Sequence, residues 1–392
     1  MHNVGLDLGT THTVVAHHGQ ALAVANAALV PSVVAYPPDG HTLVGARARL
    51  RRPVDPEHTI ASAKRVIGLP FGAGRRDQFQ SYFGAELVAA EGGGYGFRTR
   101  QGIVIPTEIS SEVVAHALDR VGITPESLDS VVVTVPSSFG LGQRAATVEA
   151  VRRAGVRRVG LIEEPVATAL AYLQRSSLRY AAVYDLGGGT FDVAVVDCLR
   201  HPFTVRAHVG DPTLGGDNID LALASHIADN VLQQHRWDLR SERTTFNRLL
   251  HACEWAKCTL SEHTEVELPL HEIDPAAPAD LPAVMITRAL LASIVTPLIH
   301  QTFALCDDVL SQAGIRATDV QAVFLAGGSS RLPGLTHRVE SYFQKRPRQD
   351  LNPMHVVALG ASYAVSRPNL CELLDLPVSR RQSQPEFRMK NP

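Results

Sequence analysis

The chain has 392 residues, of which 45% are hydrophobic and 19% charged, and its formal net charge is −2. This composition is typical of a folded globular protein, and the length exceeds what one hydrophobic core usually supports, so we expect two large lobes. Lysine and arginine are spread along the sequence rather than concentrated, which argues against nucleic acid or a membrane surface as a partner.

The chain also lacks the signals of secreted or membrane-spanning proteins. Its five cysteines show no paired C-x-x-C spacing, which argues against a disulfide framework or a zinc site. The N-terminal residues lack a basic region followed by an apolar stretch, and no continuous run of about 18 apolar residues occurs. We therefore expect a soluble protein of the cytoplasm.

The predicted elements alternate between strands and helices. In chain order, the expected strands are Asn3–Leu8, Thr13–Ala16, Val33–Tyr36, Ser130–Val135, Val159–Ile162, Ala181–Asp185, Asp192–Val196 and Ala322–Leu325. The expected helices between them are Ser110–Val121, Gln143–Ala154, Ala167–Gln174 and Asp220–His235. This alternation indicates α/β layers.

Two regions interrupt the alternation and are interpreted as insertions: a polar, proline-punctuated segment and a mainly helical one. We expect lobe I to comprise residues 1–178, with a core of 1–37 and 107–178 and an inserted subdomain of 38–106. Lobe II is expected at 179–368, with a core of 179–219 and 288–368 and an inserted subdomain of 220–287. Residues 369–392 are expected to form a linker-like segment and a disordered tail.

A sequence repeat is the feature that points to function. VGLDLGTTHT at Val4–Thr13 recurs as VYDLGGGTFD at Val183–Asp192, and in each copy an aspartate, Asp7 or Asp185, ends a strand before a turn of small residues. Bare amides in such a turn bind anions, and an aspartate at a strand end can hold a divalent cation, directly or through water. One copy would fit an ordinary hairpin, but two copies facing each other would clamp the phosphates of one nucleotide.

These motifs resemble the ATPase domain of the DnaK-type heat-shock 70 chaperones, within the actin and sugar-kinase superfamily. The resemblance extends from Val4 to about Val365 with its motifs in the family's order, and DLGGGTFD carries the Phe-Asp pair typical of the chaperones. It implies an α/β, two-lobed, actin-like ATPase fold, in which each lobe is a ribonuclease-H-like sheet-and-helix core with an inserted subdomain. It also implies ATP and ADP with Mg²⁺ as ligands, and slow ATP hydrolysis.

The resemblance assigns roles to individual residues. SAKRVIG at Ser62–Gly68 is similar to the segment that carries a lysine needed for hydrolysis. The residues expected to be catalytic are Lys64, Glu164, Asp185, Thr190 and Asp7, of which Asp7, Glu164 and Asp185 would hold Mg²⁺, mostly through water. The residues expected to bind the nucleotide are Gly9, Thr10, Thr11, His12, Gly187, Gly188, Gly189, Thr190, Gly215, Gly216, Asp217, Glu254, Lys257, Ser261, Gly327, Gly328, Ser329 and Arg331.

The purine side of the site departs from the family pattern. Glu254, Lys257 and Ser261 are spaced i, i+3 and i+7, which places all three on one helical face, although a solvated polar stripe would have the same spacing. Cys258 stands where the family has a second adenine-stacking arginine, which leaves only Arg331. The loss of such a contact costs on the order of 1 kcal/mol, or about fivefold in affinity. Met354-His355 also replaces an acidic pair at this edge.

The C-terminal segment indicates how the chain could act on other proteins. LCELLDLPV at Leu370–Val378 resembles the family's interdomain linker, with Leu373–Leu376 as its core, although the end of a terminal helix would also fit. Since only fourteen residues follow, we expect the peptide-binding domain to be lacking, in a naturally short member or a truncated one. The expected function is a nucleotide-dependent switch acting on an unknown protein partner or co-chaperone. An actin-like filament-forming ATPase, a sugar kinase and a nucleotide-binding pseudo-ATPase remain open alternatives.

Overall fold

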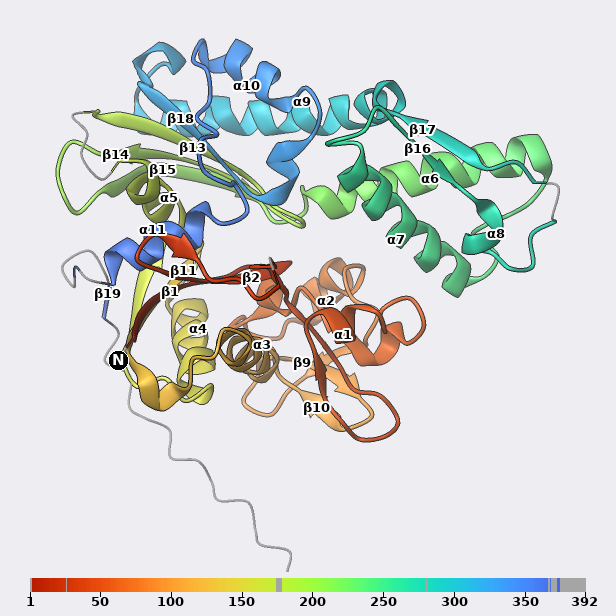
Figure 1. Cartoon of the computed structure of the whole chain (residues 1–392), viewed down its shortest axis with the longest axis horizontal. Coiled ribbons are helices and arrows are strands. Elements are labelled where there is room, and N and C mark those ends of the chain that lie inside the picture. The colour runs from red at the N-terminus through yellow and green to blue at the C-terminus, as the bar shows by residue number, and fades with distance from the viewer. Residues whose placement is uncertain are drawn as a thin grey trace, which may run out of the picture.

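Two mixed β-sheets lie at the centres of two lobes, which we call lobe I and lobe II (Figure 1). The computed structural model describes residues 2–25, 27–173, 178–278, 281–365, 367 and 372–373. The lobe I sheet has the order β19-β12-β11-β1-β2-β3, with β4 also paired to β2. Its strands are β1 (His2–Leu8), β2 (His12–His17), β3 (Gln20–Ala21), β4 (Val30–Pro31), β11 (Leu128–Val135), β12 (Val159–Glu163) and β19 (Glu372–Leu373). The lobe II sheet has the order β15-β14-β13-β18, from β13 (Tyr180–Leu186), β14 (Phe191–Asp197), β15 (Thr204–Asp211) and β18 (Ala322–Ala326).

The two sheets repeat one topology. In lobe I, β1, β2 and β3 form an antiparallel meander and β11 runs parallel to β1. In lobe II, β13, β14 and β15 form the same meander and β18 runs parallel to β13. The hairpin registers also agree, because Leu8 pairs with Thr13 and Leu186 with Phe191, so that four residues, 9–12 and 187–190, separate the last paired positions in each hairpin. The predicted duplication of an α/β core is therefore confirmed.

The four predicted helices are present, but each begins earlier than its apolar pattern indicates. They are α3 (Pro106–Arg120), α4 (Leu141–Arg153), α5 (Glu164–Tyr172) and α6 (Gly216–His235), against expected starts at 110, 143, 167 and 220. Proline, glycine and acidic residues occupy these first turns; they suit helix N-termini but interrupt an apolar periodicity. The difference matters because the first turns of α5 and α6 carry Glu164 and Asp217. Gln174, the expected end of α5, lies outside the described residues.

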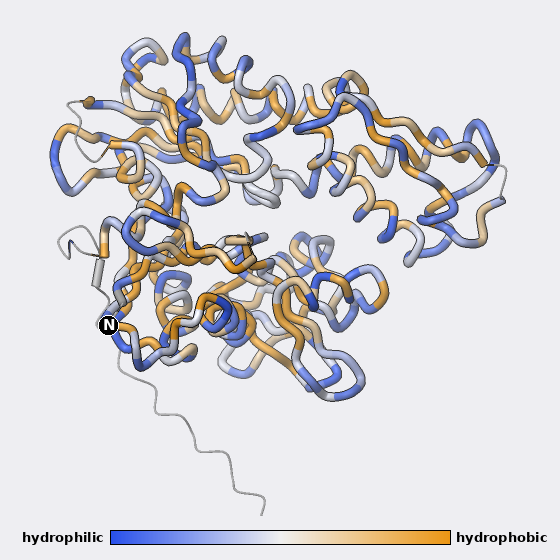
Figure 2. Tube along the Cα trace, viewed as in Figure 1, coloured by the Kyte–Doolittle hydropathy of each residue, from blue (hydrophilic) through white to orange (hydrophobic). Residues whose placement is uncertain are grey.

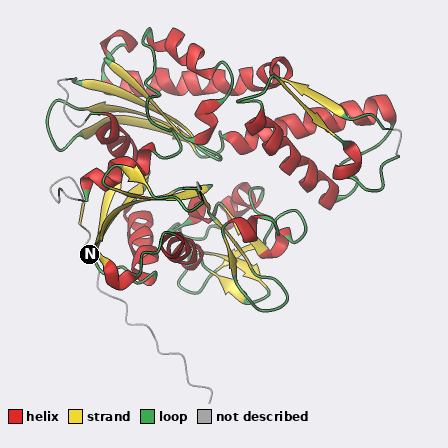
Figure 3. Cartoon of the chain, viewed as in Figure 1, coloured by secondary structure: helices red, strands yellow, loops and turns green. Residues whose placement is uncertain are grey.

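Each lobe carries an insertion beside its sheet (Figure 1). In lobe I, two three-stranded sheets are formed by β5 (Val33–Ala35), β6 (Leu43–Val44), β7 (Thr59–Ala61), β8 (Leu87–Ala89), β9 (Tyr95–Thr99) and β10 (Gly102–Val104), with α1 (Ala46–Arg49) and α2 (Ala73–Gln80). In lobe II, α6 leads into α7 (Arg243–Thr259), α8 (Leu270–Ile273), β16 (Glu265–Leu268) and β17 (Val284–Thr287). Short 3₁₀ turns lie at Pro56–His58, Ala63–Val66, Pro125–Ser127, Ala317–Asp319 and Gly328–Arg331. Figure 3 shows helices beside the central sheet of each lobe, whereas the strands of the two insertions lie towards the outside.

Two helices cross between the lobes and hold them together. They are α5 and α11 (Val356–Ala364), which pack directly on each other. The crossing is close because a Cβ added to Gly360 would overlap the carbonyl of Ala167. One buried cluster spans this junction and includes Val132 from lobe I, Val183 from lobe II and residues of both helices. In Figure 2 the apolar segments concentrate in the strands of the two central sheets and in the helices that pack against them.

Helix α9 (Arg288–Ala313) is the one described helix that is long and apolar enough to cross a membrane by length and composition. Leu291, Val295 and Ile299 on one face are buried in the lobe II core, and the helix packs on β14 and β15. A core helix passes the same test, so this observation is weak support for a membrane span. The remaining lobe II helix, α10 (Leu335–Phe343), lies beside it in the same core.

The C-terminal linker-like segment is described only at Glu372–Leu373. These two residues form β19 and pair antiparallel with Gly160 and Leu161 of β12. A helix end at Leu373, one of the two alternatives, is therefore wrong. Residues 374–376, the rest of the expected linker core, and the expected disordered tail lie outside the described residues.

Candidate active site

A cavity of about 550 Å³ opens between the lobes, and both repeated hairpins contribute to its wall. The predicted site residues that line it are Asp7, Gly9, Thr10, Thr11, His12, Lys64, Glu164, Asp185, Gly187, Gly188, Thr190, Gly327 and Gly328. They come from segments more than 300 residues apart in sequence, as from Asp7 to Gly327. The lobes therefore bring most of the predicted phosphate side into one space.

The two hairpin loops meet across this cavity. A Cβ added to Gly188 would collide with the hydroxyl of Thr11, so the second loop approaches the first more closely than any other residue type allows. Within the first loop, a Cβ on Gly9 would collide with the carbonyl of His12. The contact between Gly188 and Thr11 confirms the prediction that the two copies face each other.

Four carboxyl groups surround a single lysine at the base of the cavity. The ammonium of Lys64 lies 2.7 Å from Oε1 of Glu164, and both side chains are almost buried. Asp7 accepts a hydrogen bond from the hydroxyl of Thr134 at 2.9 Å. Burial, reinforced by the charge of Glu164, raises the pKa of Asp7 to about 6. One ammonium group cannot neutralise this cluster, which therefore favours a further cation.

Asp185 and Asp192 add to this charge from the second hairpin. They are directly opposite each other in the β13–β14 register, a placement that is unfavourable for two like charges. Burial, followed by the charge of Glu164, raises the pKa of Asp192 to about 7, although Lys64 and a hydrogen bond with Thr190 oppose the shift. The pKa of Asp185 is raised well above its usual range for the same two leading reasons.

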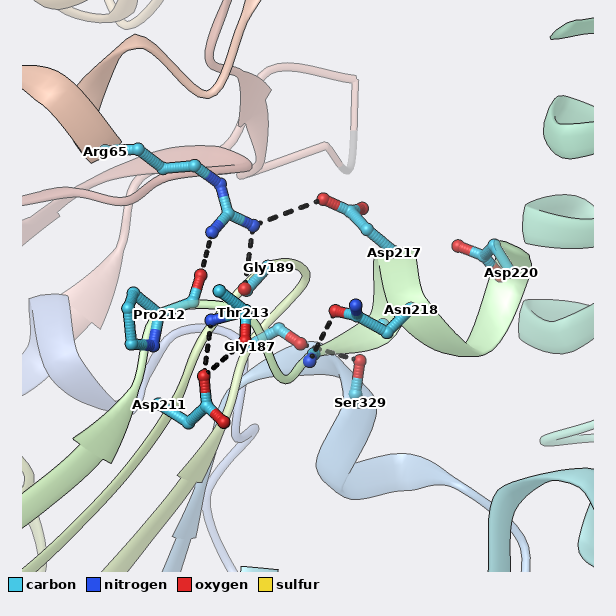
Figure 4. Close-up of polar contacts among 12 residues, drawn as sticks. Arg65, Gly187, Gly189, Asp211, Pro212, Thr213, Asp217, Asn218, Asp220 and Ser329 are labelled. Atoms are coloured by element: carbon cyan, nitrogen blue, oxygen red, sulfur yellow. Dashed lines mark hydrogen bonds and ion pairs between the residues drawn. The ribbon is translucent and has the colours of Figure 1, made fainter. Parts of the chain in front are cut away.

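The N-terminus of α6 packs behind the second loop. The amides of Gly216 and Asp217 donate to the carbonyls of Gly187 and Gly188 at 3.1 and 2.5 Å. The hydroxyl of Ser329 donates to the same Gly187 carbonyl at 2.9 Å, as Figure 4 shows. Gly189, Gly215, Gly216 and Ser329 therefore support the cavity wall from behind rather than line it. Asp217 lies with Thr10, Thr11, His12 and Glu254 at a small adjacent hollow.

The purine side differs from the prediction in one respect. Helix α7 ends at Thr259, so Ser261 lies in the following turn and does not share a helical face with Glu254 and Lys257. The reason is tertiary, because the guanidinium of Arg288 donates to the carbonyls of Leu260 and Ser261 at 2.8 and 3.1 Å. These hydrogen bonds give the carbonyls at the helix end a partner, so the helix does not need a further turn to satisfy them.

The other purine-side residues occupy three different environments. Glu254 forms an ion pair of 2.7 Å with Arg49 from the lobe I insertion, so this contact joins the two insertions. Lys257 is buried and binds Asp220 at 2.7 Å and the carbonyl of Gly216 at 3.0 Å. Although burial opposes it, the Asp220 carboxylate raises the pKa of Lys257 and keeps the ammonium charged. Arg331 is exposed, and Cys258 is an exposed free thiol.

Several lining residues were not assigned to the site from the sequence. The site residues expected from the sequence do not include Asp192, Arg65 or His208, all of which line the cavity. Arg65 directly follows Lys64 in SAKRVIG, and this position is the one feature of the sequence that could have assigned Arg65 to the site. Among the described residues, no group of three or more His, Cys, Asp or Glu side chains is placed to hold a metal ion directly.

The sequence matches the family model described as Hsp70 protein over residues 3–369, which is nearly the whole chain. The match covers both hairpins, the carboxyl cluster and both crossing helices. The two-lobed, duplicated architecture is the actin-like ATPase fold of that family.

Proposed function

The chain belongs to the Hsp70 family, and we propose that it binds and slowly hydrolyses ATP with Mg²⁺ between its lobes and acts as a nucleotide-dependent switch. The observation that carries the proposal is the meeting of two hairpin loops of equal register, Thr11 against Gly188, above four carboxyl groups and Lys64. Few other ligands require two anion-binding turns and an acidic cluster in one cavity.

The residues present fit a Mg²⁺–nucleotide complex. Asp7 and Asp192 have raised pKa values because they are buried with too little positive charge nearby, and a bound dication would relieve both. We propose that Asp7, Glu164 and Asp185 hold Mg²⁺ mostly through its water. When bound, this ion supplies charge neutralisation on the phosphates.

The protein's own groups account for positioning and proton transfer. The loop amides at 9–12 and 188–190 bind phosphate oxygens, and Lys64, fixed by Glu164, stabilises the charge of the terminal phosphate. Asp192, with a pKa of about 7, is suited to accept a proton from an attacking water at neutral pH. Thr190 orients that carboxyl group by its hydrogen bond.

The switch is supported by contacts that depend on the closed arrangement of the lobes. Arg49–Glu254 and the exposed Arg243–Glu57 pair, with N–O distances of 2.7 and 3.6 Å, both join the two insertions. Opening of the lobes about the α5–α11 crossing would separate both pairs. We propose that a protein partner or co-chaperone reads this change, and that the protein works in the cytoplasm, where its free thiols stay reduced.

Calorimetry with ATP and with ADP, each with Mg²⁺, followed by a phosphate-release assay, tests the proposal. Binding of both nucleotides and slow release of phosphate are expected, whereas binding of neither would refute the assignment. Binding without hydrolysis would favour a pseudo-ATPase, an alternative supported by Cys258 at the purine side. Sedimentation with ATP addresses the filament alternative, since a polymer would pellet.

A further inference from the structure

Arg65 projects from the lobe I insertion into lobe II (Figure 4). Its side chain is only 2% exposed. One terminal nitrogen, Nη2, donates to the carbonyl of Gly189 at 2.7 Å and lies 3.6 Å from the carboxylate of Asp217. The other, Nη1, donates to the carbonyl of Pro212. The adjacent residue Lys64 contacts Glu164 of lobe I, so two consecutive cations serve opposite lobes.

The three partners of Arg65 lie on three separate segments of lobe II. Gly189 is in the β13–β14 loop, Pro212 follows the end of β15, and Asp217 is in the first turn of α6. Internal hydrogen bonds brace two of these segments: Asp211 accepts from the amide of Thr213 at 2.7 Å, and Asn218 accepts from the amide of Gly215 at 3.1 Å (Figure 4). One planar guanidinium therefore ties together acceptors whose positions are already fixed.

The lobe I side of this contact is also fixed. The ring of Tyr82 lies 4.4 Å from the guanidinium carbon of Arg65, in a cation–π arrangement. Gly68 packs so closely on α4 that an added Cβ would overlap the carbonyl of Gly142. These contacts hold the Arg65 segment in place within lobe I, so opening of the lobes would withdraw its side chain from all three acceptors.

Gly189 has a specific relation to this side chain. A Cβ added there would collide with Nη2 of Arg65 and lie 2.7 and 3.3 Å from its Cζ and Nε, and the three atoms nearest to this Cβ all belong to Arg65. The φ of Gly189 is not in the left-handed region, so the backbone itself admits alanine. A glycine at this position makes room for Arg65.

We propose that Arg65 is a positioning residue that locks the closed cleft, so that closure of the lobes and ordering of the second phosphate loop are one event. The lock is reversible, because closure strips water from a guanidinium whose Nε has no partner among the described residues. Its effect on nucleotide retention rests on the proposed function, whereas its effect on the loop does not.

The test is a double-mutant cycle of Arg65→Gln and Gly189→Ala, read first without nucleotide. Hydrogen exchange by mass spectrometry follows the amides of residues 187–190 and 215–218. Each single variant is expected to speed exchange there by roughly tenfold or more, and the double variant is expected to match the singles, because both changes remove the same contact. Arg98→Gln, which removes an exposed ion pair with Glu86 inside the lobe I insertion, is the matched control and should leave these amides unchanged.

The same variants are then tested for release of a fluorescent ADP analogue by stopped flow. Release is expected to be about tenfold faster in all three cleft variants, and Arg65→Lys should restore little, since an ammonium cannot reach acceptors on three segments. Additive effects of the two substitutions, or unchanged exchange in Arg65→Gln, would overturn the lock. If wild-type protein binds no nucleotide but the exchange cycle behaves as expected, the proposed function fails while the lock stands.

Discussion

The pH dependence of stability tests whether Asp192 is buried among too many carboxyl groups for the positive charge nearby. Its folded-state pKa of about 7, against 3.8 for a free aspartate, means that burial disfavours the ionised form. Protonation of this group therefore stabilises the folded protein at low pH, and this contribution is lost as the pH rises through about 7. Between pH 5 and pH 8 the loss amounts to ~3 kcal/mol.

The perturbation is Asp192→Asn, which removes the titration and nearly preserves the shape. The Tm of the variant relative to wild type, measured by calorimetry without nucleotide or metal, is expected to rise by several degrees from pH 5 to pH 8. His12 and His251 have pKa values lowered to about 4 chiefly by burial, so they destabilise both proteins as the pH falls. Their effect cancels in the comparison.

A second measurement isolates the cause. Addition of Mg²⁺ and ADP should reduce the advantage of Asp192→Asn at pH 8, because a bound cation stabilises the ionised carboxyl group of the wild type. A Tm difference between variant and wild type that is the same at pH 5 and pH 8 would refute the reasoning.

Three further predictions follow from particular contacts. Lys64→Ala should reduce single-turnover ATP cleavage by roughly 10²–10³-fold while nucleotide still binds, since it removes charge stabilisation at the terminal phosphate. Gly360→Ala should lower the Tm strongly, or prevent folding, because its methyl group would overlap the Ala167 carbonyl where α5 crosses α11. Cys258→Arg should tighten ATP binding in calorimetry by about fivefold, by supplying a second cation for the adenine face.

Each of these predictions has a clear contrary outcome. An unchanged cleavage rate in Lys64→Ala with ATP bound would remove that residue from catalysis. Gly74→Ala, in α2 with no atom near the added methyl group, is the control for Gly360→Ala, and equal stability of the two would contradict the packing argument. Unchanged affinity in Cys258→Arg would show that this helix position does not face the base.

Much of the site could be predicted from the sequence because its signal is local. Each hairpin is a strand, a turn of small residues and a strand, so the ten residues from Val4 to Thr13 and from Val183 to Asp192 suffice to define both phosphate loops. Their equal register in the two sheets follows from that local pattern. Helix interiors were also predictable, whereas helix starts were not, because polar first turns carry no apolar periodicity.

What the sequence determined by itself is the pair of hairpins, the alternation of elements and, through them, the family. The tertiary structure alone decided which side chains meet. Arg288 lies in a later helix, and its hydrogen bonds to the carbonyls of Leu260 and Ser261 end α7 before Ser261. The residues around Ser261 carry no local pattern that predicts this helix end. Arg65 resembles any other arginine until closure of the lobes brings it to Gly189. Contacts of this kind depend on the positions of distant backbone atoms, which only packing of the complete chain fixes.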